Sequence, residues 1–135
     1  MQKTQIWIID DNTIDNFISS TVLGKCISNV SIVCHTDPVI ALRQLQSLVA
    51  TSQELPGVIF LDISMPVMNG FEFLNEFEKL PIKGENYPVI LMLSSSSDKD
   101  DVRLALSHKE VSKYLVKPLT TTVIDDLKKE QIIRS

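Results

Sequence analysis

The sequence predicts an α/β fold in which one doubly wound parallel sheet is covered by helices on both faces. Short apolar runs alternate with segments of helical spacing five times along 135 residues. The runs are continuously apolar, as in Ile6-Trp7-Ile8-Ile9, and a continuous run indicates a strand that is buried on both faces. With 44% hydrophobic residues the chain can build a single core, so we expect one domain over residues 1–135.

The strands and helices are predicted from these runs and from the residues that punctuate them. Strands are expected at residues 5–10, 30–34, 57–62, 89–93 and 114–116. The second helix is well marked, because Asp37 suits an N-cap and Pro38 the first helical position. Gly24 is expected to end the first helix. The other helices are expected at residues 13–24, at about 70–80, after a cap at Ser97 or Asp98, and around Val123, Ile124 and Leu127.

Two helices have apolar faces that the spacing assigns to the core. In the first helix these residues are Ile14, Phe17, Ile18 and Val22. In the fourth they are Val102, Ala105 and Leu106. Residues three or four positions apart lie on one side of a helix, so each set should pack against the sheet.

Composition excludes several classes of protein. The net charge is −4, and the 13 Lys and Arg residues are scattered, so the basic stripe of a nucleic-acid-binding protein is missing. Cys26 and Cys34 lie among apolar residues and are interpreted as reduced core thiols. No apolar run is long enough for a membrane span or a signal peptide. We therefore expect a cytoplasmic protein that contacts neither DNA nor a membrane.

Charged residues stand at the ends of three of the expected strands. Asp10 and Asp11 follow the first strand, Asp62 ends the third, and Lys117 follows the fifth. The carboxyl ends of parallel strands share one edge of a sheet, and ligands bind in the crevice there. Carboxylates this close repel one another unless a cation neutralises them. Mg²⁺, which prefers carboxylate and phosphate oxygens, is the cation that fits best.

Each of these residues also has a simpler interpretation. Asp10-Asp11-Asn12 could only cap the first helix, and Lys117 could be a surface lysine. Asp62 favours the functional interpretation, since an acid at the end of a buried strand is costly without a partner. His35 and His108 have no second ligand at a metal-binding spacing, and we interpret both as structural or solvated.

A carboxylate at such an edge can act as a nucleophile toward phosphorus, and Asp62 is the candidate. Ser94 ends the fourth strand and is the one member of Ser94-Ser95-Ser96-Ser97 placed to face the crevice. Lys117 would balance the charge of a phosphoryl group. Tyr114 precedes Lys117 by three residues, so it points to the opposite face, as a half-buried aromatic with a solvated hydroxyl.

With these residues in this order, the chain resembles the receiver domain of two-component response regulators. The resemblance rests on Asp10-Asp11, on Asp62 followed by Met-Pro-x-Met-Asn-Gly, on Ser94 and on Lys117-Pro118. It implies a flavodoxin-like sheet of order 2-1-3-4-5 and a cis bond between Lys117 and Pro118. It also implies that Asp62 is the phosphoacceptor and that Mg²⁺ is held by Asp10, Asp11, Asp62 and the carbonyl of Ser64.

The same resemblance implies a phosphoprotein that switches a signal rather than an enzyme with a substrate of its own. Its phosphoryl donor would be a sensor histidine kinase or a histidine phosphotransfer protein. Ser94 would engage the phosphoryl group and Tyr114 would reorient, changing the face of the fourth helix, fifth strand and fifth helix that binds a downstream protein. The chain ends about one helix after Lys117-Pro118, so no output domain is expected.

Two other functions remain open from the residues alone. A small Mg²⁺-dependent phosphatase of the haloacid-dehalogenase type also uses a nucleophilic Asp, a Ser or Thr and a Lys. Its two Asp residues are separated by one position, whereas Asp10 and Asp11 are adjacent. A flavodoxin-like electron carrier needs a phosphate-binding loop where this chain has Asp10-Asp11-Asn12, which would repel the phosphate.

Overall fold

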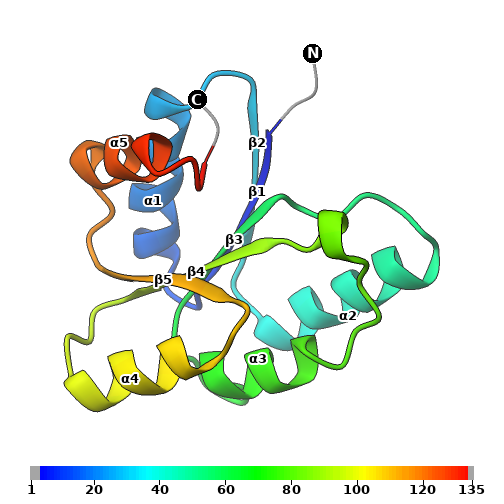
Figure 1. Ribbon diagram of the computed structural model, residues 1–135. Helices are drawn as coiled ribbons and strands as arrows, with labels where there is room; N and C mark the ends of the chain where they lie inside the picture. The colour runs from blue at the N-terminus through cyan, green and yellow to red at the C-terminus, as the bar shows by residue number, and fades with distance from the viewer. Residues whose placement is uncertain (1–3, 134–135) are drawn as a thin grey trace.

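The computed structural model describes residues 4–133 and contains one sheet of five parallel strands (Figure 1). The spatial order of the strands is β2-β1-β3-β4-β5, which confirms the expected fold class and strand order. The strands are β1 (Thr4–Ile9), β2 (Val30–His35), β3 (Val58–Leu61), β4 (Val89–Ser94) and β5 (Val111–Val116). Because β1 and β3 are neighbours, the chain reverses its direction of winding between them, which opens a crevice at their carboxyl ends.

Five helices cover the two faces of the sheet (Figure 1). On one face lie α1 (Thr13–Cys26) and α5 (Thr121–Lys129), and on the other lie α2 (Pro38–Ala50), α3 (Gly70–Phe77) and α4 (Lys99–Ser107). A short 3-10 helix, η1 (Gly84–Asn86), precedes β4. Each face has its own apolar core: Phe73 and Phe77 belong to one, Leu23 and Ile124 to the other.

The helix starts agree with elementary capping chemistry. The Asp37 side chain accepts hydrogen bonds from the backbone of Val39 and Ile40, with Pro38 at the first helical position. Asp98, and not Ser97, caps α4. Asn69 and Glu72 form a reciprocal capping box at the start of α3, which fixes the end of the loop that follows β3.

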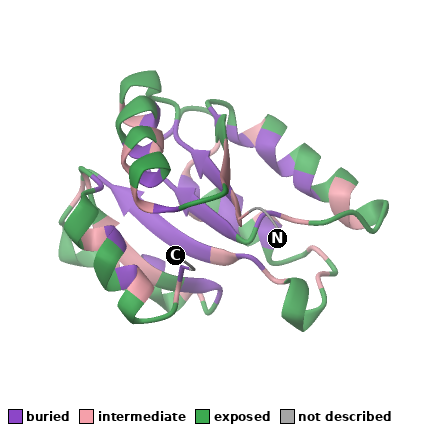
Figure 2. Ribbon diagram, turned by 90° about the horizontal axis from the view of Figure 1, so that it is seen from above, coloured by how far each residue is buried: buried purple, intermediate pink, exposed green. Residues whose placement is uncertain are grey.

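β3 is buried along its length and β1 and β4 are buried except at their first residues, whereas the edge strands β2 and β5 are largely half-buried or exposed (Figure 2). In β2 both Val33 and Cys34 are exposed, so the expectation that Cys34 is a core thiol was wrong. An edge strand has a neighbour on one side only and receives less cover from the helices. Both cysteines are free thiols, as expected.

Of the expected apolar face of the first helix, Val22 packs against the core, but Ile14, Phe17 and Ile18 do not. Ile14 is 69% exposed and Phe17 is 70% exposed, whereas Asn16, Ser19 and Leu23 face inward. Asn16 explains this rotation, because its amide donates a hydrogen bond of 2.8 Å to the backbone carbonyl of Asp10. This buried hydrogen bond at the end of the strand, and not the apolar periodicity, determines which side of the helix faces the sheet.

Smaller differences affect α1 and α4. α1 continues past Gly24 to Cys26, because Gly is tolerated within a helix at a modest cost, and the turn comes later, at Ser28 and Asn29. Leu106 of α4 is half exposed, although Ala105 is fully buried as expected. Within residues 4–133, no helix is long and apolar enough to cross a bilayer.

Candidate functional site

Three carboxylates gather at the carboxyl ends of β1 and β3. The two strands pair in parallel with Ile9 opposite Leu61, so the residues that follow them, Asp10 and Asp62, come side by side. Asp10 is 3% exposed and Asp62 is 6% exposed, while Asp11 lies at the surface of the turn. One oxygen from each of the three lies within 4.8 Å of the others. The sequence placed all three at this edge, and the structure brings them together.

Lys117 reaches this cluster from the far side of β4. Its backbone follows β5, its N–H donates to the carbonyl of Ser94 at 2.8 Å, and its bond to Pro118 is cis, as expected. The ammonium nitrogen lies 2.6 Å from Asp10 Oδ2, 2.8 Å from Asp15 Oδ2 and 3.4 Å from Asp62 Oδ2. With a side chain only 13% exposed, Lys117 is a site residue and not a surface lysine.

Asp15 is a member of this cluster that the sequence analysis missed. It lies in the first turn of α1, where an acidic residue ordinarily complements the helix dipole. That ordinary role hides its contact with Lys117, which lies 102 residues later in the chain. The one available signal was its spacing, because Asp15 follows the Asp10-Asp11 pair by about one helical turn.

The electrostatics of the cluster reflect burial and crowding. Burial, and then the charge of Asp10, raise the pKa of Asp62 to about 6, although Lys117 and the Ile63 N–H oppose the change. Burial by itself would lower the pKa of Lys117, but hydrogen bonds to Asp10 and Asp15 and the charge of Asp62 raise it. Lys117 is therefore a permanent cation that neutralises part of an acidic pocket.

Ser94 and Tyr114 are connected through the backbone of one residue. Ser94 is buried at the end of β4, and its hydroxyl oxygen accepts a hydrogen bond from the N–H of Ser96 at 3.1 Å. Tyr114 is half-buried, and its hydroxyl donates to the carbonyl of Ser96 at 2.8 Å instead of being solvated only. The Ser96 hydroxyl in turn donates to Asp101 of α4 at 2.7 Å. The sequence pattern had placed Ser94 alone among these serines at the crevice, so the role of Ser96 was missed.

The loop after Asp62 is held close to the site. Ser64, two residues after Asp62, is exposed. The Ile63 N–H donates to Asp62 Oδ1 at 2.8 Å, and the Gly70 N–H donates to the carbonyl of Ile63 at 2.8 Å. A Cβ atom on Gly70 would lie 2.4 Å from the carbonyl oxygen of Asp62. Gly70 is therefore required by close approach and not by its backbone conformation, since no glycine within residues 4–133 has a positive φ.

Known proteins provide an independent comparison with this fold and site. The sequence matches the response regulator receiver domain family over residues 6–128, and the chain belongs to that family. A two-component response regulator from Cytophaga hutchinsonii is 30% identical, with a TM-score of 0.83 over 97% of this chain and 98% of that chain. A receiver protein from Dyadobacter fermentans is 29% identical, with a TM-score of 0.78 over 95% and 97%.

Among curated sequences, a protein-glutamate methylesterase/protein-glutamine glutaminase of Rhodopseudomonas palustris is 30% identical over 122 residues. That match covers 90% of this chain but 31% of the relative. Matches to the first three curated relatives span from 31% to 59% of their lengths. The family membership shows that this chain is a receiver domain, a phosphoaccepting signalling switch with a regulatory role. The haloacid-dehalogenase alternative gains no support.

Proposed function

We propose that Asp62 is the phosphoacceptor of this switch. The observation that carries the proposal is a buried carboxylate with one oxygen held by the Ile63 N–H and the other facing Lys117. An oxygen of Asp62 would form a bond to the phosphorus of a phosphohistidine while the donor's nitrogen–phosphorus bond breaks.

The acidic pocket suits a divalent cation. Asp10, Asp11 and Asp62 offer oxygen atoms only, and with Asp15 they place four carboxylates near one ammonium group. Oxygen ligands and an excess of negative charge fit Mg²⁺, with the Ser64 carbonyl as a further proposed ligand. Bound Mg²⁺ would supply positive charge for the transferring phosphoryl oxygens. Lys117 would add a second positive charge from the opposite side.

The Ser96 connection provides a route from phosphorylation to the surface. If the Ser94 hydroxyl turns toward the phosphoryl oxygen, it releases the N–H of Ser96. The Ser96 carbonyl and hydroxyl hold Tyr114 and Asp101, so both β5 and α4 respond to that release. This is a local change of charge that biases a two-state element.

The acceptor assignment is tested with acetyl phosphate, a small donor that needs no partner protein. Asp62→Ala should abolish the acid-stable, hydroxylamine-labile mass increase, while Asp125→Ala, an exposed acid on α5, should retain it. A full mass increase in Asp62→Ala would show that another residue accepts the phosphoryl group.

The exposed face of α1 favours a protein as the natural donor. Ile14, Phe17 and Ile18 are exposed beside Asp15, whose carboxylate contacts Lys117 in the pocket. An apolar patch at the rim of a reaction site marks a docking surface more often than scattered apolar residues do. We assign this patch to the phosphodonor, a sensor histidine kinase or a histidine phosphotransfer protein in the cytoplasm.

Two variants separate docking from chemistry. The cognate donor is found first, by profiling the histidine kinases of the host. Phe17→Ala should slow phosphotransfer from that donor by about 10-fold, which is the effect of losing an interface residue that contributes over 1 kcal/mol. It should leave uptake from acetyl phosphate unchanged. Ile40→Ala, an equally apolar and exposed position on α2, should alter neither rate. Equal slowing with both donors would place the effect in the pocket and contradict the docking assignment.

The downstream surface is proposed on the face of α4, β5 and α5. Leu104 and Leu106 of α4 and Val116 of β5 are exposed apolar residues, and Tyr114 lies between them in the chain. A partner that binds there would sense the Ser96 contacts described above.

A further inference from the structure

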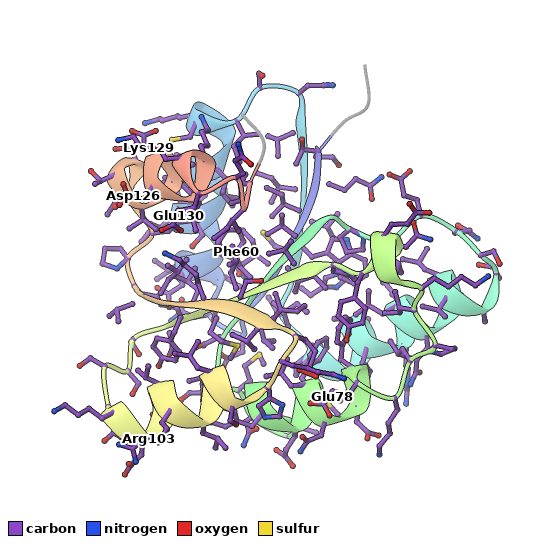
Figure 3. The ribbon with its side chains drawn as sticks, in the orientation of Figure 1. Phe60, Glu78, Arg103, Asp126, Lys129 and Glu130 are labelled. Carbon is purple, nitrogen blue, oxygen red and sulfur yellow. The ribbon has the colours of Figure 1, made fainter. Side chains whose placement is uncertain are left out.

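A second group of potential metal ligands lies outside the acidic pocket. Glu78 follows the last residue of α3, His108 follows the last residue of α4, and Glu110 immediately precedes β5. One oxygen from each carboxylate and one ring nitrogen of His108 lie within 4.8 Å of one another. Figure 3 shows Glu78 at the end of α3, beside the turn that joins α4 to β5.

Glu110 is the unusual member of this group. It is 7% exposed, and among the described residues neither of its carboxylate oxygens has a well-formed hydrogen bond to a donor group. A buried carboxylate without a partner is expensive, so native structures provide it with a proton, a donor or a cation. Glu110 faces the carboxyl group of Glu78, and burial and then the hydrogen bond between these two groups raise the pKa of Glu110, so the pair needs either a shared proton or a cation.

The remaining contacts leave a place for a cation. His108 Nδ1 lies 2.8 Å from Glu78 Oε1, so two of the three ligand atoms are already in contact. Lys109 lines the adjoining cavity but makes no ion pair with Glu78 or Glu110 within residues 4–133. That cavity, of about 610 Å³ and lined also by Tyr87 and Ser112, connects the group to solvent. A metal ion therefore has an entry path.

We propose that Glu78, His108 and Glu110 form a site for a transition-metal dication of the Zn²⁺ class. An imidazole with two carboxylates is a ligand set typical of Zn²⁺, whereas Mg²⁺ disfavours nitrogen. Ligands of a tetrahedral zinc ion lie about 3.4 Å apart. The half-exposed Glu78 side chain therefore has to move away from His108 Nδ1, which lies 2.8 Å from Glu78 Oε1. Water would complete the coordination.

This site is distinct from the proposed magnesium site in position and in chemistry. The acidic pocket lies at the carboxyl ends of the strands, whereas Glu110 precedes the first residue of β5 at the opposite edge. A bound ion would link the ends of α3 and α4 to the start of β5. The link would restrain α4, which carries part of the proposed downstream surface.

The test is a zinc titration by calorimetry in saturating Mg²⁺, which occupies the acidic pocket. A Cys34→Ser background removes the exposed thiol, the other strong zinc ligand at the surface. We expect one Zn²⁺ per chain. His108→Asn and Glu110→Gln should each weaken binding by more than about 10-fold, since loss of an outer-shell partner alone costs 10–100-fold. Glu85→Gln, the same charge change at an exposed position, should bind as the parent does.

Thermal unfolding supplies a second readout that also verifies folding. Zn²⁺ should raise the Tm of the parent and of Glu85→Gln, but not that of His108→Asn or Glu110→Gln. Co²⁺ in place of Zn²⁺ should give visible absorption bands that the two ligand variants lose. Absence of zinc binding in the parent, or equal affinity in the parent and both folded ligand variants, would overturn the proposal.

Discussion

Lys117 lies closer to Asp15 than to Asp62, at 2.8 Å against 3.4 Å. The ammonium group is therefore held between Asp10 and Asp15 at the rim of the pocket, and it contacts the proposed phosphoacceptor more weakly. To stabilise a phosphoryl group on Asp62, Lys117 has to weaken its contact with Asp15. Asp15 competes with the phosphoryl group for the same cation.

Asp15→Asn should accelerate phosphorylation by acetyl phosphate. The substitution keeps the size of the side chain but removes the charge that holds Lys117, and a partly exposed ion pair contributes about 0.5–1 kcal/mol, or roughly 2- to 5-fold in rate. The rate is measured by mass spectrometry at saturating Mg²⁺. Asp125→Asn is the control for the loss of one negative charge. A slower reaction in Asp15→Asn alone would mean that Asp15 positions Lys117 productively.

Asp62→Asn should stabilise the Mg²⁺-free protein at neutral pH. The pKa of Asp62 in the folded protein is about 6, above the ordinary 3.8, so ionising this residue opposes folding. The full penalty applies above about pH 6 and disappears below about pH 4, where both states are protonated. We expect a gain of about 1–2 kcal/mol in the free energy of unfolding at pH 7.5.

The pH dependence of that gain is the decisive part of the measurement. Urea unfolding at pH 7.5 and at pH 4 should show the gain shrinking toward zero at the lower pH. A gain of the same size at both pH values would indicate that burial of Asp62 does not raise its pKa.

Gly70→Ala should destabilise the protein, because the new Cβ would lie 2.4 Å from the Asp62 carbonyl oxygen. Backbone shifts of this kind cost about 1–3 kcal/mol. Gly24→Ala is a matched control, since it adds the same methyl group within α1 with nothing inside 4 Å, and it should stabilise by about 0.5–1 kcal/mol. Urea unfolding compares the two, and effects of equal sign would contradict the structural reason.

Ser64→Arg should prolong the life of the aspartyl phosphate. Ser64 and Ser95 are both small and exposed beside the pocket, so water reaches the phosphoryl group with little hindrance. A long basic side chain at position 64 would cover that approach and slow dephosphorylation by about 3-fold, or ~0.6 kcal/mol. The decay is followed at saturating Mg²⁺, with Ser28→Arg as the charge control. Unchanged or faster decay, with Mg²⁺ affinity intact, would show that access past Ser64 does not control the lifetime.

The sequence by itself determined the features that depend on local pattern. Continuous apolar runs placed the five strands, and Asp37 caps the second helix where cap chemistry put it. Asp10, Asp62, Ser94 and Lys117 follow or end buried strands, so the rule that parallel strands share a carboxyl edge was enough to bring them together. The order of the strands came from the family resemblance and not from spacing.

Only the tertiary structure decided which side of α1 faces the sheet and which residues join the cluster. Periodicity assigned Ile14 and Phe17 to the core, but the hydrogen bond from Asn16 to the Asp10 carbonyl rotates the helix and leaves both exposed. The same rotation brings Asp15 to Lys117, and the meeting of helix ends brings His108 to Glu78. Asp15 and Lys117 are 102 positions apart, and Glu78 and His108 are 30 positions apart. A local sequence pattern cannot predict such contacts, because only the packing of the chain brings these residues together.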